Sequence, residues 1–138
     1  VYLPSGKAEE RSAASKLTWH VLDTYNPSMA TKLASIMREF RPDVIHTNNI
    51  SGFSVSVWLA ARNNRIPVVH TTRDFYLICP KGTMVKRGAS CAKQCRSCKG
   101  YSFLRRYASR FVSHVVGISN FILQRHQEYG FFDGVDSS

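Results

Sequence analysis

Short apolar runs alternate along this chain with longer stretches that have helical periodicity. Runs with the composition of buried strands lie at residues 1–4, 44–46, 66–72 and 113–119. Helices are predicted over residues 12–25, 26–40, 51–65, 101–112 and 120–130. Alternation of this kind is typical of βαβ units. We therefore predict an α/β fold, a Rossmann-like parallel sheet with helices on both faces.

The second helix has the clearest boundaries. Asn26 can cap its first turn, Pro27 suits its first position, and Pro42 ends it. One face is predicted to enter the core, and it carries Met29, Leu33, Ile36, Met37 and Phe40.

Two predictions concern the C-terminal third of the chain. The helix at residues 101–112 has Phe103, Leu104, Tyr107 and Phe111 on one side, which we expect to face the core. Ser119 should cap the last helix and Gly130 should end it, so that residues 131–138 form an exit linker.

The composition indicates one soluble domain. The chain has 138 residues, 43% of them hydrophobic, which argues against disorder. No run approaches the roughly 18 apolar residues of a membrane-spanning helix, and no signal peptide opens the chain. We expect a cytoplasmic protein. Because the first residue is valine and a complete sheet would have more strands, we also expect a truncated piece of a longer protein.

Positive charge is concentrated in one region. The formal net charge is +10. Residues 73–110 contain ten basic residues and one acidic residue, Asp74. The basic residues are Arg73, Lys81, Lys86, Arg87, Lys93, Arg96, Lys99, Arg105, Arg106 and Arg110. This asymmetry favours a polyanionic partner, such as a phosphorylated ligand, nucleic acid or an acidic membrane surface, although a solvated surface accounts for any single cation.

Three predicted strands end in polar residues. Since ligands of open parallel sheets bind at the carboxyl ends of the strands, these residues are the candidate substrate-binding set. They are Thr47, Asn48, Asn49, Thr72, Arg73, Asp74, Ser119 and Asn120. His46 and His70 also lie near strand ends, where a histidine is more often a core residue than a ligand contact. Neither the dinucleotide-binding nor the P-loop glycine motif is present.

Three sequence motifs within roughly residues 41–130 resemble those of a known protein family. "RPDVIHTNN", "IPVVHTTRDFYLICP" and "VVGISNFILQRH", in this order, are similar to the N-terminal half of family 4, GT-B fold glycosyltransferases. The resemblance implies an enzyme that transfers a sugar from a nucleotide sugar to an acceptor with retention, without a metal for chemistry. It implies that this part is the acceptor-side domain, and that a C-terminal domain with a Glu-x7-Glu motif, absent here, binds the donor. The fragment alone should then be inactive.

One position departs from the family pattern. Many members have His-Asp where this chain has Arg73-Asp74, so a histidine role cannot be assigned there. Arg73 offers a planar, permanently charged group suited to phosphate, either of the acceptor or of the donor diphosphate. The alternative is a structural ion pair with Asp74 or Asp43.

A cysteine-rich basic loop spans residues 79–100. Cys79, Cys91, Cys95 and Cys98 are the only cysteines, and the last two form a C-x2-C pair. Four thiolates suit structural zinc, but disulfides and free thiols remain alternatives. The loop would lie on the acceptor side of the cleft between the two domains that the resemblance implies. There its charge suits a lipid-linked phosphate acceptor or peripheral contact with the inner face of the membrane.

A rival interpretation is a zinc-containing basic module that binds nucleic acid. The net charge and the aromatics Tyr101, Phe103 and Tyr107 favour it. The placement of these aromatics on a predicted core face, together with the alternating βα pattern, counts against it.

Overall fold

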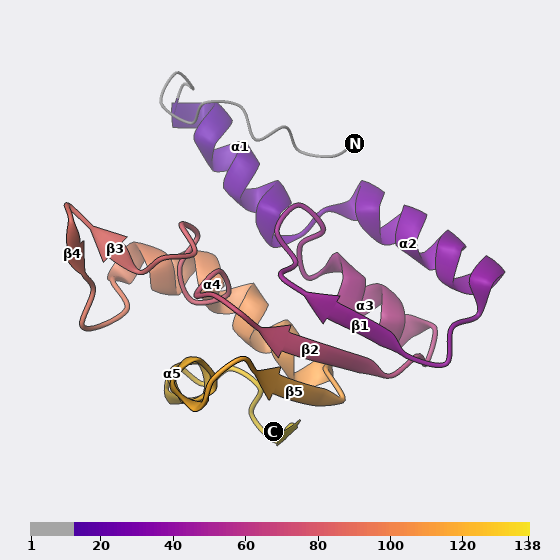
Figure 1. Ribbon diagram of the computed structural model, residues 1–138. Helices are drawn as coiled ribbons and strands as arrows, with labels where there is room; N and C mark the ends of the chain where they lie inside the picture. The colour runs from indigo at the N-terminus through magenta and orange to yellow at the C-terminus, as the bar shows by residue number, and fades with distance from the viewer. Residues whose placement is uncertain (1–12) are drawn as a thin grey trace.

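The computed structural model describes residues 13–138, and the strands of its main sheet run parallel (Figure 1). They lie in the order β1-β2-β5-β6. Their bounds are Ile45–Asn48, Val68–Thr72, His114–Gly117 and Asp136–Ser137. The predicted α/β class, a parallel sheet flanked by helices, is confirmed. The strand predicted at residues 1–4 lies outside the described residues.

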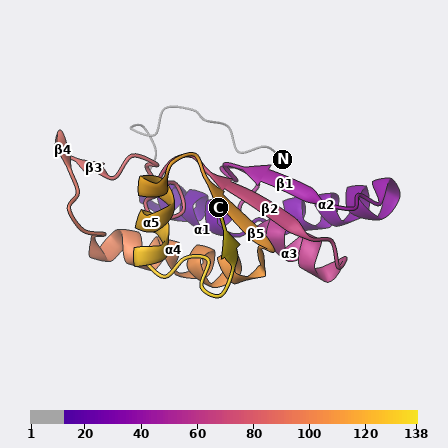
Figure 2. The same ribbon diagram turned by 60° about the horizontal axis from the view of Figure 1, so that its bottom comes forward.

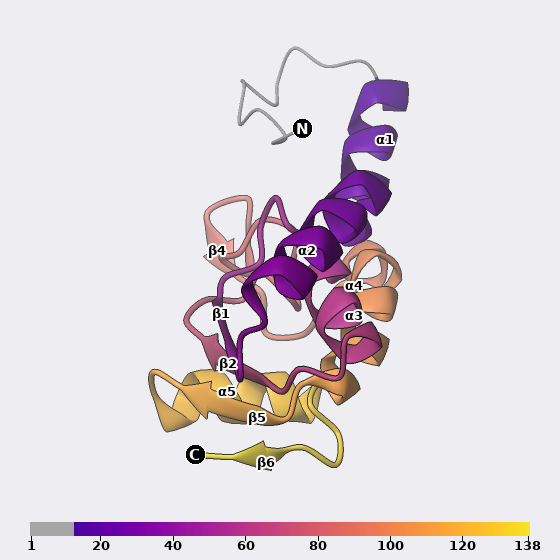
Figure 3. The same ribbon diagram turned by 90° about the vertical axis from the view of Figure 1, so that its right-hand side faces the viewer.

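Helices connect the parallel strands. Their bounds are α1 Ala13–Thr24, α2 Pro27–Phe40, α3 Ser56–Asn63, α4 Arg96–Ala108, the 3₁₀ helix η2 Ser109–Phe111, and α5 Asn120–Glu128. The strand order advances across the sheet in one direction, and α3, α4 and α5 each connect one strand to the next. Since such crossovers are right-handed, these three helices lie on the same face of the sheet. Figures 2 and 3 show α3 and α4 on one side of the sheet.

The core lies between the sheet and this helical layer. The ring of Phe132 contacts Trp58 of α3, His70 of β2 and His126 of α5. Along β2, residues 68, 70 and 72 are buried, whereas Val69 and Thr71 are only half-buried. The sequence predicted buried strands with helices on both faces of the sheet. In the described residues one face is buried and the other is partly covered.

The predicted boundaries of α2 are confirmed. Asn26 Oδ1 accepts a hydrogen bond from Met29 N at 3.1 Å, and Pro27 is the first helical residue. At the other end, Arg41 adopts a left-handed conformation just before Pro42.

The predicted core face of α2 is only partly correct. Met29 and Met37 are buried, but Ile36 and Phe40 are 51% and 78% exposed. α2 packs mainly on α3 rather than on the sheet, so only a narrow stripe of it is covered.

Helix α4 differs from its prediction. It begins at Arg96, inside the cysteine-rich segment, and buries Ser102, Arg105 and Ala108. The predicted core side was wrong at Phe103 and Tyr107, which are 64% and 51% exposed. α4 packs against α1, and a buried ion pair between these helices, described below, determines which side of α4 faces inward.

The exit linker predicted at residues 131–138 was also wrong. Phe131 and Phe132 are buried in the core, and Asp136–Ser137 forms β6 beside β5. Helix α5 itself begins and ends as predicted, with Ser119 as its cap and Gly130 at φ +74° after its last turn. Two aromatic side chains fill the space beside His126, so the chain continues as part of the fold.

The cysteine-rich segment contains two kinds of structure. Residues 79–95 form a loop that includes the antiparallel hairpin of β3 (Val85–Lys86) and β4 (Ala89–Ser90), and residues 96–100 belong to α4. The hairpin projects from the end of the molecule to which β1, β2 and β5 point (Figures 1 and 2).

Candidate functional site

A small hollow opens at the carboxyl ends of β1 and β2. Its volume is only about 10 Å³, room for about one water molecule, and it is lined by Asn49, Ile50, His70, Thr71, Thr72, Arg73, Asp74, Tyr76, Leu77 and His126. Parallel pairing of β1 with β2 brings the ends of the two strands together, as the sequence predicted. A hollow of this size is smaller than the roughly 300–1,000 Å³ of complete ligand pockets. By itself it is too small to hold a substrate.

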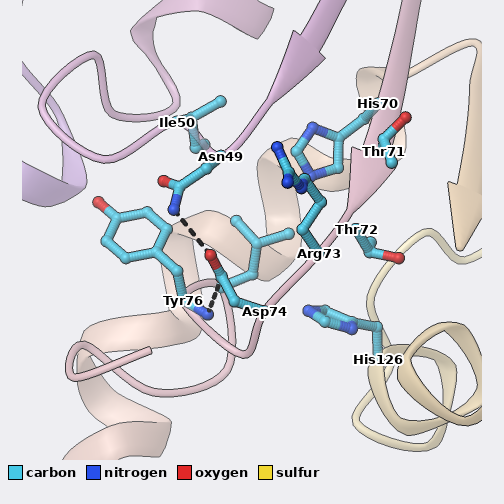
Figure 4. Close-up of a pocket in the computed structure, with 10 residues that line it drawn as sticks. Asn49, Ile50, His70, Thr71, Thr72, Arg73, Asp74, Tyr76 and His126 are labelled. Atoms are coloured by element: carbon cyan, nitrogen blue, oxygen red, sulfur yellow. Dashed lines mark hydrogen bonds between the residues drawn. The ribbon is translucent and has the colours of Figure 1, made fainter. Parts of the chain in front are cut away.

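Asn49 and Asp74 form a link between the loops that follow β1 and β2. Asn49 Nδ2 donates to Asp74 Oδ2 at 2.7 Å, and Asp74 Oδ1 accepts from Tyr76 N at 2.7 Å (Figure 4). Asn49 adopts a left-handed conformation, φ +48°, and its Oδ1 accepts from Ser51 N. Both side chains are thus held by neighbouring loops, so their polar atoms are oriented before any ligand binds.

Arg73 lies next to this link and is exposed. Its side chain points away from Asp74 in Figure 4. Within residues 18–138 it forms no hydrogen bond or ion pair, so the alternative of a structural pair with Asp74 or Asp43 does not hold in this structure. An unpaired guanidinium beside oriented polar groups can form a bidentate contact with a phosphate or a carboxylate.

Two predicted site residues point into the protein. Thr47 is buried, and its Oγ1 accepts from Trp58 Nε1 at 3.1 Å and contacts His70 Nδ1 at 2.9 Å. Thr72 is buried too, and its hydroxyl donates to Val116 O. Their hydroxyl groups are therefore engaged inside the protein at this edge of the sheet.

The remaining predicted residues are exposed. Asn48 ends β1, and Ser119 and Asn120 begin α5 after β5. Ser119 Oγ accepts from Ile122 N, which occupies its side chain as a helix cap. Asn48, Ser119 and Asn120 do not line the hollow that contains Arg73 and Asp74.

His70 and His126 border the hollow as uncharged groups. Burial lowers the pKa of His70 to about 3, and the nearby imidazoles of His126 and His46 act in the same direction. Burial also lowers the pKa of His126. His70 is therefore a neutral core residue, as the sequence suggested for a lone strand histidine. His46 lies on the exposed side, with Nε2 2.8 Å from Thr71 Oγ1.

A buried cluster that the sequence did not reveal lies beneath the loop after β2. Arg105 donates to Asp23 Oδ2 at 2.6 Å and to Tyr76 O at 2.7 Å, and the Tyr76 hydroxyl donates to Asp23 Oδ1 at 2.7 Å. Arg105 and Asp23 are 1% and 0% exposed. Burial also raises the pKa of Tyr76. Since Asp74 is two residues from Tyr76, this cluster anchors the segment that carries the site.

Comparison with known proteins identifies the family. Residues 4–134 match the profile of Glycosyltransferase Family 4. The chain belongs to glycosyltransferase family 4. It is also 36% identical, over 127 residues, to a Klebsiella pneumoniae protein described as "Uncharacterized 42.6 kDa protein in cps region". The alignment covers 92% of this chain and 34% of that relative, so the chain spans about a third of the relative's length.

The family assignment decides between the two functional interpretations. Nothing in the comparisons supports the nucleic-acid-binding module. One argument against that module was wrong, because Phe103 and Tyr107 are exposed rather than in the core. The glycosyltransferase interpretation rests instead on the match over nearly the whole chain.

Proposed function

We propose that this family 4 chain is the acceptor-side part of a two-domain enzyme that transfers a sugar from a nucleotide sugar to an acceptor, with retention of configuration. The observation that carries the proposal is the exposed, unpaired Arg73 beside the Asn49–Asp74 link at the carboxyl edge of the sheet. A second domain facing this edge would complete the small hollow. The isolated chain should then be inactive.

Arg73 is proposed to bind phosphate. Transfer from a nucleotide sugar leaves a nucleoside diphosphate, and negative charge grows on its oxygens as the bond to the sugar breaks. A guanidinium that contacts those oxygens stabilises the charge without a bound metal. The same group could hold the phosphate of a lipid-linked acceptor, so both substrates have to be varied in the test.

The acceptor is proposed to be a growing cell-surface polysaccharide or its phospholipid-linked precursor. The relative in the cps region, and the basic loop at residues 79–100 near the same end of the molecule, support this choice. No helix within residues 13–138 is long and apolar enough to cross a membrane. A cytoplasmic enzyme held peripherally at the inner membrane face would reach such an acceptor.

The test is steady-state sugar transfer by the full-length protein, with the nucleotide sugar and the acceptor varied in turn. A charge-assisted hydrogen bond contributes about 1.5–3 kcal/mol, so Arg73→Ala should lower kcat/KM by roughly 10- to 100-fold. If Arg73 holds the acceptor phosphate, the loss should appear in the KM of the acceptor. If it stabilises the leaving diphosphate, the loss should appear in kcat. Arg73→Lys should keep only part of the kcat/KM that Arg73→Ala loses, because an ammonium group cannot bind bidentately.

Arg65→Ala is the matched control. Arg65 is also exposed but lies before β2, at the opposite end of the strand from Arg73. Its replacement should leave all kinetic constants unchanged. Equal activity of the Arg73→Ala and Arg65→Ala proteins would refute the role of Arg73, and absence of any sugar transfer by the unmodified protein would refute the proposed function.

A further inference from the structure

The four cysteines come together although they are spread over twenty positions. Cys79 ends the turn that follows the site loop, Cys91 follows β4, and Cys95 and Cys98 lie at the start of α4. All four border one open hollow of about 200 Å³, between the hairpin and α4. Within the described residues none of them forms a disulfide. The fold therefore brings every thiol of the chain to one place.

One pair of the thiols has the separation expected of two ligands on a tetrahedral metal. Cys98 Sγ donates a hydrogen bond to Cys79 Sγ, and the two sulfur atoms are 3.8 Å apart. Two ligands of a tetrahedral zinc ion with Zn–S bonds of about 2.3 Å are separated by about 3.8 Å, whereas a disulfide bond is only about 2.05 Å. No set of three ligand side chains in the part that the structure describes already surrounds a single point. Metal binding would therefore require the four side chains around the hollow to move closer to one point.

Uncompensated positive charge surrounds the thiols. Residues 79–99 contain six lysines and arginines and no acidic residue, and none of the six forms an ion pair with a described residue. Lys81 and Lys86 border the same hollow. Arg96 and Lys99 lie in the first turn of α4, where the helix dipole already disfavours cations. A group that carries net negative charge between them would relieve this repulsion.

The hairpin has little to hold it in place. Residues 85–90 are all exposed, and each strand is only two residues long. An isolated two-stranded hairpin is marginally stable in water, and small elements without a core need a cross-link or a metal. Met84 and Cys79 are the buried side chains that connect the loop to the core.

We propose that Cys79, Cys91, Cys95 and Cys98 bind one zinc ion as a structural tetrathiolate. Four thiols release four protons as they bind Zn²⁺, and the product carries a net charge of −2, which the surrounding lysines and arginines neutralise. Four cysteine ligands leave no open position, so the metal folds the loop and takes no part in the chemistry. Cys79 N donates to Phe75 O, so the metal also fixes the segment that begins at Arg73.

The experiment measures metal and thiols on the purified protein and requires no sugar transfer, so its outcome is independent of the proposed function. The protein is prepared under reducing conditions without chelator, and zinc per chain is determined by elemental analysis. We expect one zinc per chain, and four thiols that react only after a chelator is added. Cobalt titrated into the metal-free protein should give the visible absorption of a tetrahedral site and the charge-transfer absorption of four thiolates.

Single Cys→Ser variants and one control complete the test. Each of the four should bind zinc at least tenfold more weakly, and a variant that does not fold is replaced by the cobalt titration of the unmodified protein. His20 borders the same hollow without being a proposed ligand, so His20→Gln should keep the full zinc content. Less than a tenth of a zinc per chain with four reactive thiols, or disulfides in the freshly reduced protein, would overturn the proposal. Loss of zinc in His20→Gln would overturn the four-thiolate set.

Discussion

Asp23 and Arg105 form the most deeply buried ion pair in the described residues. Burying two charges costs several kcal/mol each, so a pair of this kind is retained only with good geometry and additional hydrogen bonds. Arg105 also donates to Tyr76 O, and its guanidinium lies 4.1 Å from the centre of the Tyr76 ring. The pair thus connects α1, α4 and the loop after β2.

Removing one partner should be costly. In Asp23→Ala, the Arg105 guanidinium stays buried without its carboxylate, and we expect a loss of about 3–5 kcal/mol in the free energy of unfolding. Replacing both residues, in Asp23→Ala/Arg105→Met, should recover part of this loss because no uncompensated charge remains. Urea unfolding of the single and double variants measures both effects.

The exposed pair of Arg110 and Asp133 provides the comparison. The Arg110 guanidinium and the Asp133 carboxylate are 2.9 Å apart, and the two side chains are 51% and 67% exposed. Asp133→Ala should therefore change the free energy of unfolding by less than about 1 kcal/mol. If Asp23→Ala and Asp133→Ala cost the same, burial would not be the source of the stability of the Asp23–Arg105 pair.

The sequence could reveal some of these residues and not others. The caps Asn26 and Ser119 were predicted because each acts on an amide nitrogen three residues away. Asp23 and Arg105 are separated by 82 positions, and Arg105 looks like one more surface cation in a basic region. The direction in which Thr47 and Thr72 point depends on which strand face is buried, and that follows from packing rather than from the order of residues.

At the scale of elements, α5 approaches β5 very closely at Gly117. A Cβ atom at this position would lie 2.7 Å from Leu123 Cβ and 2.8 Å from Ser119 O. Neither neighbour can move easily, because one belongs to a buried side chain and the other to the backbone. The absence of a side chain at Gly117 therefore determines how α5 starts, and with it where Ser119 and Asn120 lie.

Gly117→Ala should separate β5 from α5. We expect a loss of about 1–3 kcal/mol in the free energy of unfolding, the usual cost of inserting a carbon into a packed contact. Gly100→Ala is the matched control, since Gly100 lies inside α4 and a Cβ atom added there would have no neighbour within 4 Å. That change should be neutral or stabilise by up to about 1 kcal/mol. Equal effects of the two substitutions in thermal unfolding would contradict the close contact.

Elements were predictable where periodicity and caps agree. The parallel strands β1, β2 and β5 were predicted from their short apolar runs. The inward face of α4 was not, because its buried positions are polar or small: Ser102, Arg105 and Ala108. β6 was missed because Asp136 and Ser137 carry no strand signal, and their position depends on the burial of Phe131 and Phe132.

For the whole molecule, the distribution of charge is the main feature. Of the ten basic residues between positions 73 and 110, Arg105 and Arg110 form ion pairs, and the other eight form none within the described residues. The hairpin that carries Lys86 and Arg87 projects at the end where the strands β1, β2 and β5 finish. An anionic surface that approached this end would meet the loop and the candidate site together.

Neutralising the loop should weaken binding to anionic vesicles. Each basic residue near such a surface contributes about 1 kcal/mol, so Lys86→Gln, Arg87→Gln, Lys93→Gln and Arg96→Gln combined should weaken binding by roughly a hundredfold or more at low salt.

The control replaces four exposed cations elsewhere, Lys32, Arg38, Arg41 and Arg65, by glutamine, which gives the same net charge. If charge position matters, only the loop variant should lose sedimentation with vesicles of phosphatidylglycerol, and its zinc content should be checked to show that the loop is still folded. Equal losses in both variants would mean that overall charge alone attracts the protein, and unchanged binding of the loop variant would exclude the loop as a membrane contact.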